Sequence, residues 1–431
     1  MSIGTGRHRV ASALGRRSAA HNLVAQGGAL AVVSLMSLLI GRHAGPAVLG
    51  EYTLLRVLPW LTGVVFSCGV PVASAYFLAG ERKSDPRLRP TLAVLVAAGA
   101  ALALAVWLAL TPLLRHLLFA AVPMWLLVLS GLLVVTQLVT VWGKACCQGE
   151  ADMFGSNMLI VGEELLVLPC YLFAVLIGVN GIEGVVFGML GGGLLASTTA
   201  LIRLTHNGFT QGWRRPSAQL ASEVTRYGAR GQLGNLLWLV NLRLDFVILG
   251  ALAGPAVLGV YAVASKFAEL MRLPATALNY VLYPRFARAS AETAGQEANR
   301  LLPRAAAVTI AMTPILAIAS VYLLPLLYGK AFQGAVLPSC ILLGGLAVEG
   351  AAAVASAYLC GTGRPGANSW GMGVGVVVTI TLDILLIPGH QAVGAAVAST
   401  AAYLVTTGLL TTLTRIMTAR TARPATPVEA T

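Results

Sequence analysis

Long apolar runs are the feature that most constrains the fold of this chain. Each run could cross about 30 Å of hydrocarbon as a helix that rises about 1.5 Å per residue. There are twelve of them, and they cover residues 20–41, 52–79, 90–114, 117–145, 155–178, 183–205, 230–252, 259–284, 303–327, 333–360, 367–388 and 392–415. Apolar residues make up 57% of the chain and charged residues only 10%, too few to solvate the surface of a water-soluble fold. The sequence therefore predicts an all-α polytopic membrane protein with twelve transmembrane helices.

The 29 lysines and arginines are distributed unevenly over the loops between these runs. When the N-terminus is placed in the cytoplasm, the opposite side of the membrane holds only Arg42, Arg115 and Lys330. This asymmetry follows the positive-inside rule for a chain with both termini in the cytoplasm. The net charge of +13 is therefore a topology signal and does not indicate a nucleic-acid partner. We expect a multi-pass protein of the inner (plasma) membrane.

The heptad AGPAVLG occurs once in each half of the chain, at Ala44–Gly50 and at Ala253–Gly259. In each copy a tyrosine follows after one intervening residue, Tyr52 and Tyr261 respectively. We interpret the heptad as the short non-cytoplasmic turn between the first two helices of a repeat. Its Gly-Pro breaks the helix, and its second glycine is expected to let the chain turn tightly into the next helix.

The repeat divides the chain into an N-terminal six-helix bundle (1–205), a cytoplasmic linker (206–229) and a C-terminal six-helix bundle (230–417). Residues 418–431 are expected to form a disordered cytoplasmic tail. Because each bundle contains an even number of helices, both begin on the same membrane face. The two repeats should therefore run parallel, related by an axis along the membrane normal.

Ionisable side chains within the apolar runs are costly, so they are expected to face a cavity or a partner. The basic ones are Arg56, Arg243, Lys266 and Arg272, and the acidic ones are Glu163, Glu164, Asp245, Glu269, Glu349 and Asp383. In one interpretation they are structural ties, with Asp245 bound to Lys266. Glu269 would then pair with Lys266 or Arg272 at helical spacing. In the other interpretation the basic groups line a cavity and bind a diphosphate, which the planar fork of arginine suits.

The carboxylates have a second possible role, because a buried carboxylate can carry a proton or hold a sodium ion. Glu163 and Glu164 are adjacent, so their side chains point about 100° apart and only one can face a cavity squarely. No cluster has metal-ligand spacing and no catalytic triad is suggested, so neither a cofactor nor an enzymatic activity is expected. A coupling cation, H⁺ or Na⁺, is the exception left open.

Two segments resemble a known family. Residues 240–290, which begin VNLRLDFVILGALAGPAVLG, are similar to the seventh and eighth helices of polysaccharide-transport flippases. Residues 358–400, with GTGRP and LDILLIP, are similar to that family's tenth-to-twelfth-helix region. The superfamily also contains multidrug and toxin extrusion transporters and lipid II flippases. The resemblance implies two six-helix bundles around a central cavity.

The same resemblance implies a function. The expected activity is translocation of undecaprenyl-diphosphate-linked oligosaccharide from the cytoplasmic to the outer leaflet, by alternating access, for cell-surface polysaccharide biosynthesis. The implied partners are this lipid-linked oligosaccharide, membrane lipids, and a polysaccharide polymerase or export machinery. Three alternatives stay open: a cation-coupled multidrug exporter, a lipid II flippase, and a membrane polysaccharide polymerase or ligase. Against the first, residues 21–41 contain no carboxylate, and against the last, the non-cytoplasmic loops are short.

Overall fold

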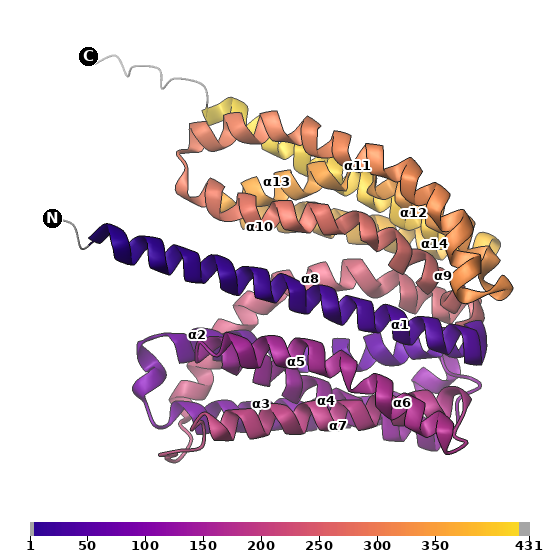
Figure 1. The fold of residues 1–431 in the computed structure, drawn as a ribbon, viewed down its shortest axis with the longest axis horizontal. Coiled ribbons are helices and arrows are strands. Elements are labelled where there is room, and N and C mark those ends of the chain that lie inside the picture. The colour runs from indigo at the N-terminus through magenta and orange to yellow at the C-terminus, as the bar shows by residue number, and fades with distance from the viewer. Residues whose placement is uncertain (1–3, 422–431) are drawn as a thin grey trace. The chain divides into compact units, whose positions relative to one another are not determined.

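The computed structural model describes residues 4–421 of the chain. Its side chains are described except at 4–23, 231, 233–235, 237–242, 280 and 420–421. Within these residues the fold is helical and contains no strand, which confirms the predicted all-α class (Figure 1). The α-helices are α1 Gly4–Phe66, α2 Val70–Ala79, α3 Leu88–Leu117, α4 Met124–Gly149, α5 Met153–Leu165, α6 Val167–Leu176, α7 Gly181–His206, α8 Ala218–Ala253, α9 Pro255–Ala268, α10 Arg272–Arg288, α11 Ala291–Tyr328, α12 Val336–Leu346, α13 Glu349–Gly361 and α14 Pro365–Thr421. Three 3₁₀ turns connect some of them: η1 Glu81–Ser84, η2 Glu269–Met271 and η3 Lys330–Ala335.

The predicted apolar runs lie largely on helix, although residues 67–69 and 118–123, which belong to two of the runs, lie between helices. The helices α1 and α14 each contain two helices that meet at a kink, at Gly45 and at Gln391 respectively, so each accounts for two predicted runs. Other runs are divided between two consecutive helices: the run 155–178 covers α5 and α6, and the run 333–360 covers α12 and α13. Seven described helices are long and apolar enough to cross a membrane. Lys330–Leu346 (η3 with α12) and α13, which meet at a bend of 43°, add an eighth if they count as one span. The chain is a multi-pass membrane protein.

The chain divides into two compact units. Unit 1 comprises Glu51–Leu236 together with the chain up to Ala44, and unit 2 comprises Gly45–Gly50 together with the chain from Leu237 onward. The boundary between the two units, between Leu236 and Leu237, lies inside α8. This helix begins at Ala218, so it also includes the second half of the predicted linker. At the other end, helix α14 continues to Thr421, and residues 422–431 of the predicted tail lie outside the described residues.

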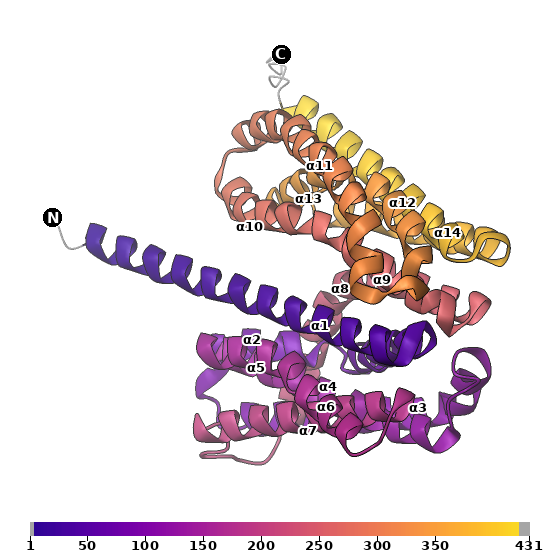
Figure 2. The same ribbon diagram turned by 45° about the vertical axis from the view of Figure 1, so that its right-hand side comes forward.

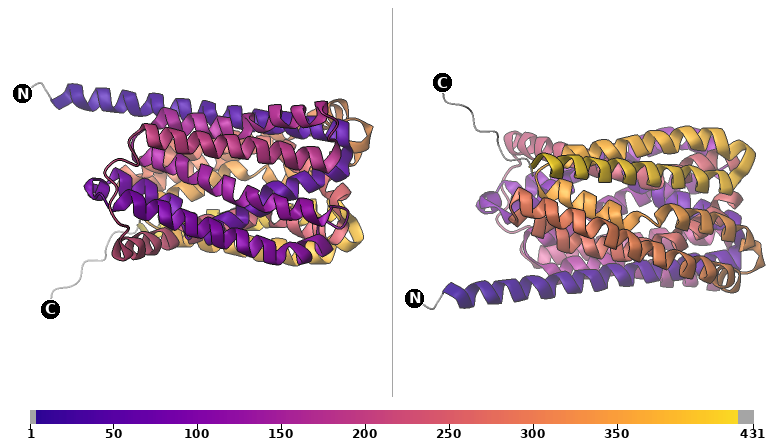
Figure 3. Two further views of the ribbon diagram at one scale, coloured as in Figure 1. Left: turned by 90° about the horizontal axis from the view of Figure 1, so that it is seen from below. Right: turned by 90° about the horizontal axis from the view of Figure 1, so that it is seen from above.

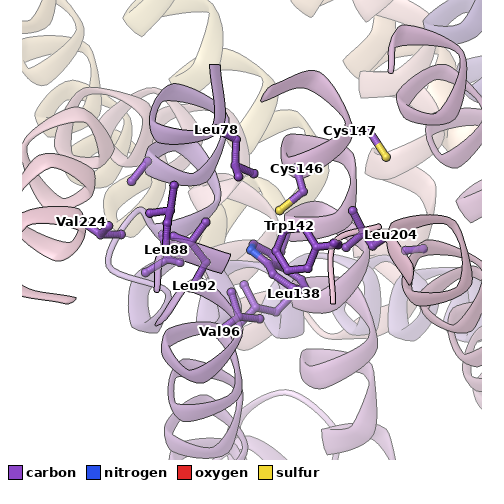
Figure 4. Packing of buried hydrophobic residues seen from close by; sticks show 14 of the residues in the cluster. Leu78, Leu88, Leu92, Val96, Leu138, Trp142, Cys146, Cys147, Leu204 and Val224 are labelled. Carbon is purple, nitrogen blue, oxygen red and sulfur yellow. The ribbon is translucent and has the colours of Figure 1, made fainter. Parts of the chain in front are cut away.

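The core of unit 1 forms where α4 packs against α2, α3 and α7 (Figure 3, left). Trp142 lies in the middle of this core, and its indole nitrogen donates a hydrogen bond to the Ser74 hydroxyl over 3.2 Å. Figure 4 shows Leu92, Leu138 and Cys146 around the indole ring. The buried cysteines act here as small apolar packing residues.

In unit 2, α13 packs against α10 and α11, and α12 packs against α14 (Figure 2; Figure 3, right). Phe286 of α10 meets Tyr358 of α13 edge to face, with ring centroids 6.0 Å apart. Long aromatic and aliphatic side chains thus fill the space between helices, while many outward-facing positions remain apolar and exposed, such as Ile315 and Leu385. An apolar outer surface of this kind is suited to lipid.

The two heptad copies adopt the same backbone break. Gly45 has φ 82° and ψ −179°, and Gly254 has φ 85° and ψ 171°. This region of conformational space is open essentially to glycine alone. Each glycine therefore stops one helix, and the proline that follows starts the next. The interpretation of the heptad as a helix-breaking turn is confirmed.

The role expected for the second glycine was wrong. Gly50 and Gly259 do not turn the chain, because each lies within the helix that follows the break. They lie instead where the two copies cross, since a Cβ on Gly50 would overlap the carbonyl of Pro255 and one on Gly259 would overlap that of Pro46. Only residues without side chains allow backbones to approach so closely. The two turns consequently lie side by side within unit 2.

Candidate functional site

Several ionisable residues within the apolar runs form ion pairs, in both units. In unit 1, Arg56 of α1 binds Glu164 of α5 through both guanidinium Nη atoms, with Nη1 donating to Oε2 over 2.7 Å. The same Nη1 also lies 3.4 Å from the hydroxyl of Tyr52. A two-point contact of this kind is the strong form of an arginine–carboxylate pair.

The neighbouring carboxylate binds a different helix. Glu163 pairs with Lys144 of α4, a partner that the sequence analysis did not identify. Glu164 therefore joins α5 to α1, and Glu163 joins α5 to α4. This arrangement follows from their divergent directions on one helix.

In unit 2, Arg243 of α8 donates a hydrogen bond of 3.1 Å to Glu269 and lies 5.3 Å from the ring centre of Phe246. The sequence interpretation had paired Glu269 with Lys266 or Arg272, on the assumption of one continuous helix. The helix is interrupted instead by η2, which begins at Glu269. A 3₁₀ turn advances the chain by about 120° per residue instead of about 100°, so the side chains after it point in other directions than in one continuous α-helix.

Arg272 follows η2 directly and is the first residue of α10. Its Nε lies 3.7 Å from the Glu349 carboxylate, too far for a hydrogen bond, and is a buried atom with no hydrogen-bond partner in the described part of the chain. Its guanidinium lies 5.0 Å from the ring centre of Tyr403. Lys266 lies in the last turn of α9 and is half-buried.

Asp245 is buried and has hydroxyl partners. The Tyr261 hydroxyl donates to it over 2.7 Å, the Ser399 hydroxyl lies 3.4 Å away, and the backbone N–H of Phe246 donates over 2.9 Å. The sequence interpretation had proposed Lys266 as its partner and did not identify the two hydroxyls. One signal for Tyr261 was present, because it is the tyrosine that follows the second heptad.

Asp383 of α14 is fully buried, and neither carboxylate oxygen has a hydrogen-bond partner among the described residues. Asp383 lies close enough to Asp245 for the two side chains to interact electrostatically. Since the hydroxyls of Tyr261 and Ser399 lie beside Asp245, the two carboxylates and the two hydroxyls share one region of unit 2. An isolated ionised carboxylate is strongly disfavoured in such an apolar setting. Among the described residues no group of three or more His, Cys, Asp or Glu side chains could hold a metal ion.

Comparison with known proteins adds a family model and several structures. The family model described as polysaccharide biosynthesis protein matches residues 65–290. A search of curated protein sequences finds no match.

Among solved structures, the lipid II flippase MurJ in its inward closed conformation superposes with a TM-score of 0.75 at 12% identity, covering 91% of this chain and 86% of the other. An inward-facing multidrug resistance MATE family transporter of the MOP superfamily gives a TM-score of 0.75 at 13% identity, covering 92% and 95%. A MOP superfamily transporter from Pyrococcus furiosus gives 0.63 at 13% identity, covering 94% and 96%. At these identities the likeness shows a common fold.

Proposed function

Because this chain belongs to the polysaccharide biosynthesis protein family, we propose that it is a flippase for undecaprenyl-diphosphate-linked oligosaccharide. It would carry the saccharide head of this lipid from the cytoplasmic to the outer leaflet of the plasma membrane by alternating access. Solved proteins of the same fold are named as transporters and a flippase, in keeping with a function that is not enzymatic. A polysaccharide polymerase or export machinery would then receive the product.

The observation that carries this proposal is the incompletely satisfied guanidinium of Arg272. A buried donor without a partner costs about 1–3 kcal/mol, which a bound anion would recover. The Nε of Arg272 is such a donor among the described residues, and its ion-pair partner Glu349 lies 3.7 Å away, too far for a hydrogen bond. The planar fork of arginine presents donors in the geometry that phosphate oxygens accept. Arg272 is therefore the residue that we assign to the diphosphate first.

The other basic side chains within the membrane would bind the diphosphate by exchanging a carboxylate partner for a phosphate group. Arg243 is held by Glu269 through a single hydrogen bond, and both side chains keep about a quarter of their surface accessible. A diphosphate carries more negative charge than one carboxylate and could displace Glu269. Arg56 is held more firmly by Glu164, through two contacts, and Lys266 is placed on the helix before η2.

We assign coupling to the region of Asp245 and Asp383. A proton or a sodium ion bound there would neutralise a carboxylate that has no partner of its own among the described residues. The donors are oxygen atoms from two carboxylates and two hydroxyls, which are hard ligands suited to Na⁺ and equally able to hold a proton. Release of the cation would leave two like charges in one buried region and so favour a rearrangement of unit 2.

The second candidate is a cation-coupled multidrug exporter, since a transporter named as multidrug resistance has the same fold. The two candidates differ in the charge of what they carry. The experiment is flipping of fluorescent undecaprenyl-diphosphate oligosaccharide in vesicles containing the wild-type chain, Arg272→Ala or Arg272→Lys. We expect transport by the wild type, loss in Arg272→Ala and partial activity in Arg272→Lys, because lysine keeps the charge without the fork.

Drug efflux measured on the same vesicles separates the candidates. Cationic dye efflux by the wild type, without flipping of the lipid-linked saccharide, would replace the flippase with the exporter. Flipping that is unchanged in Arg272→Ala would remove Arg272 from the site.

A further inference from the structure

Two tyrosines of unit 1 form an exposed stacked pair. The ring of Tyr76 on α2 lies 4.3 Å from that of Tyr227 on α8, and the two planes are inclined by 17°. Phe77 meets both rings edge-on and packs against the buried core of the unit, so the pair is held in place from behind. Tyr76 is 56% exposed and Tyr227 is 39% exposed. Neither hydroxyl has a hydrogen-bond partner among the described residues.

Polar side chains lie beside the tyrosine pair on the same face of α8. Glu223 precedes Tyr227 by four residues and forms an ion pair of 3.1 Å with Arg82. Gln219 lies one turn further back, and its amide donates to Glu223 over 3.4 Å. Residues four apart share one face of a helix. A face with this many charges and amides contacts water rather than hydrocarbon.

Two arginines extend this surface. Arg226 and Arg230 lie one turn apart on α8, and both are exposed. Neither forms an ion pair with any residue that the structure describes. They precede the apolar part of α8, on the side of the membrane where the basic loops gather. Their charges are therefore available to an anion at the membrane surface.

We propose that Tyr76 and Tyr227, with Glu223, Arg226 and Arg230, form a surface that binds the saccharide diphosphate of a lipid-linked glycan before translocation. This proposal rests on the proposed flippase function and adds a saccharide-reading site to it.

The chemistry of the surface matches both parts of such a ligand. A sugar ring has an apolar C–H face that packs on an aromatic ring, and hydroxyls at its edge that bond to carboxylates, amides and phenols. Tyr76 and Tyr227 supply the rings, and Glu223 supplies acceptors next to them. The adjacent arginines supply donors for the diphosphate that joins sugar to lipid. Aromatic residues that only anchor a protein at the lipid headgroups would need the rings alone, without the neighbouring carboxylate and arginines.

The test compares two probes on the full chain in nanodiscs: undecaprenyl diphosphate carrying a defined disaccharide, and undecaprenyl diphosphate alone. We expect the wild type to bind the first at least about tenfold more tightly, a difference of about 1.4 kcal/mol. The Tyr76→Ala/Tyr227→Ala variant should lose this preference and keep its affinity for the bare carrier. Tyr76→Phe/Tyr227→Phe should retain most of the preference, because the rings remain. The matched control is Trp125→Ala/Phe187→Ala, which removes another exposed aromatic contact of unit 1.

Oxidative footprinting of the wild-type chain gives a second measurement that needs no variant. The disaccharide probe should protect Tyr76 and Tyr227 from hydroxyl radicals, and undecaprenyl diphosphate alone should not. Equal binding of both probes, an unaltered preference in the double alanine variant, or absence of protection would overturn the saccharide surface. None of these results would remove flipping itself, which the vesicle assay measures separately.

Discussion

Gly50 and Gly259, equivalent residues of the two heptad copies, pack backbone against backbone. A Cβ built on either glycine would lie 3.0 Å from the backbone nitrogen of the other and would overlap a proline carbonyl of the opposite copy. The repeated sequence thus forms a contact with itself. Its glycines are required by this crossing, and the breaks at Gly45 and Gly254 are required by the turn.

Gly50→Ala and Gly259→Ala should each destabilise the protein by about 1–3 kcal/mol, because the crossing backbones must move apart to admit a methyl group. The measurement is thermal melting in detergent. Gly344→Ala is the matched control, since a Cβ there meets nothing within 4 Å and alanine favours helix. Equal melting temperatures for the Gly50 and Gly344 variants would show that the crossing is not tight in solution.

Arg243 and Glu269 allow the structural and the substrate-binding interpretations to be separated. Arg243→Ala should lower stability, because it leaves Glu269 without its partner, and Arg243→Ala/Glu269→Ala should recover much of that loss. The double-mutant cycle should give a coupling energy of about 0.5–3 kcal/mol. If Arg243 binds the diphosphate, flipping stays low in the double variant even though melting is restored. Restored flipping would make the pair a structural tie only.

Asp383→Asn removes a buried charge and keeps the shape of the side chain. We expect melting to be unchanged or raised, because the carboxylate oxygens have no hydrogen-bond partner among the described residues. Flipping driven by a sodium or pH gradient should fall to the rate of vesicles without a gradient. Glu292→Gln, on an exposed carboxylate at the start of α11, serves as the control and should respond to the gradient as the wild type does. A full gradient response in Asp383→Asn would move the coupling site elsewhere.

Asp152, in the turn before α5, gives a pH-dependent prediction outside the membrane. The Arg203 guanidinium, aided by the Gly155 N–H and the Asn207 amide, holds the pKa of Asp152 well below its ordinary value. A depressed folded-state pKa adds stability above the unfolded value of about 3.9, and this stability is lost as the pH falls below it.

Asp152→Asn should therefore have a lower melting temperature than the wild type at pH 7. The free energy of unfolding should be smaller by about 1–3 kcal/mol. The difference should shrink as the pH falls below about 4, because the Asp152 carboxylate of the unfolded wild-type chain then gains a proton while that of the folded chain stays ionised. Melting curves of both proteins at pH 7 and in steps below pH 4 measure it. A constant difference across that range would mean that the carboxylate charge contributes nothing.

Topology is tested by single-cysteine labelling in cells with a membrane-impermeant reagent. A cysteine at Pro255 lies in the second heptad turn and should be labelled from outside, whereas one at Gln219, in the first turn of α8, should be labelled only after permeabilisation. The opposite result would invert the orientation derived from the basic loops.

The sequence by itself determined the membrane class, the positions of the helices and the repeat. These properties are local: twenty apolar residues in succession prefer lipid wherever they occur, and Gly-Pro breaks a helix by its own backbone preferences. The extent of α8 was underestimated, because residues 218–229 are polar and carry no apolar signal although they are helical.

Which charges meet was decided by the tertiary structure. Spacing within one helix suggested Lys266 or Arg272 for Glu269, and it did not suggest Arg243 on α8, which donates a hydrogen bond to Glu269. A pairing between helices depends on how each helix is rotated about its axis, and a three-residue 3₁₀ turn at Glu269 changes that rotation without any mark in the apolar pattern. For the same reason no local signal could place Ser399 beside Asp245, since the packing that joins them involves residues far apart in the chain.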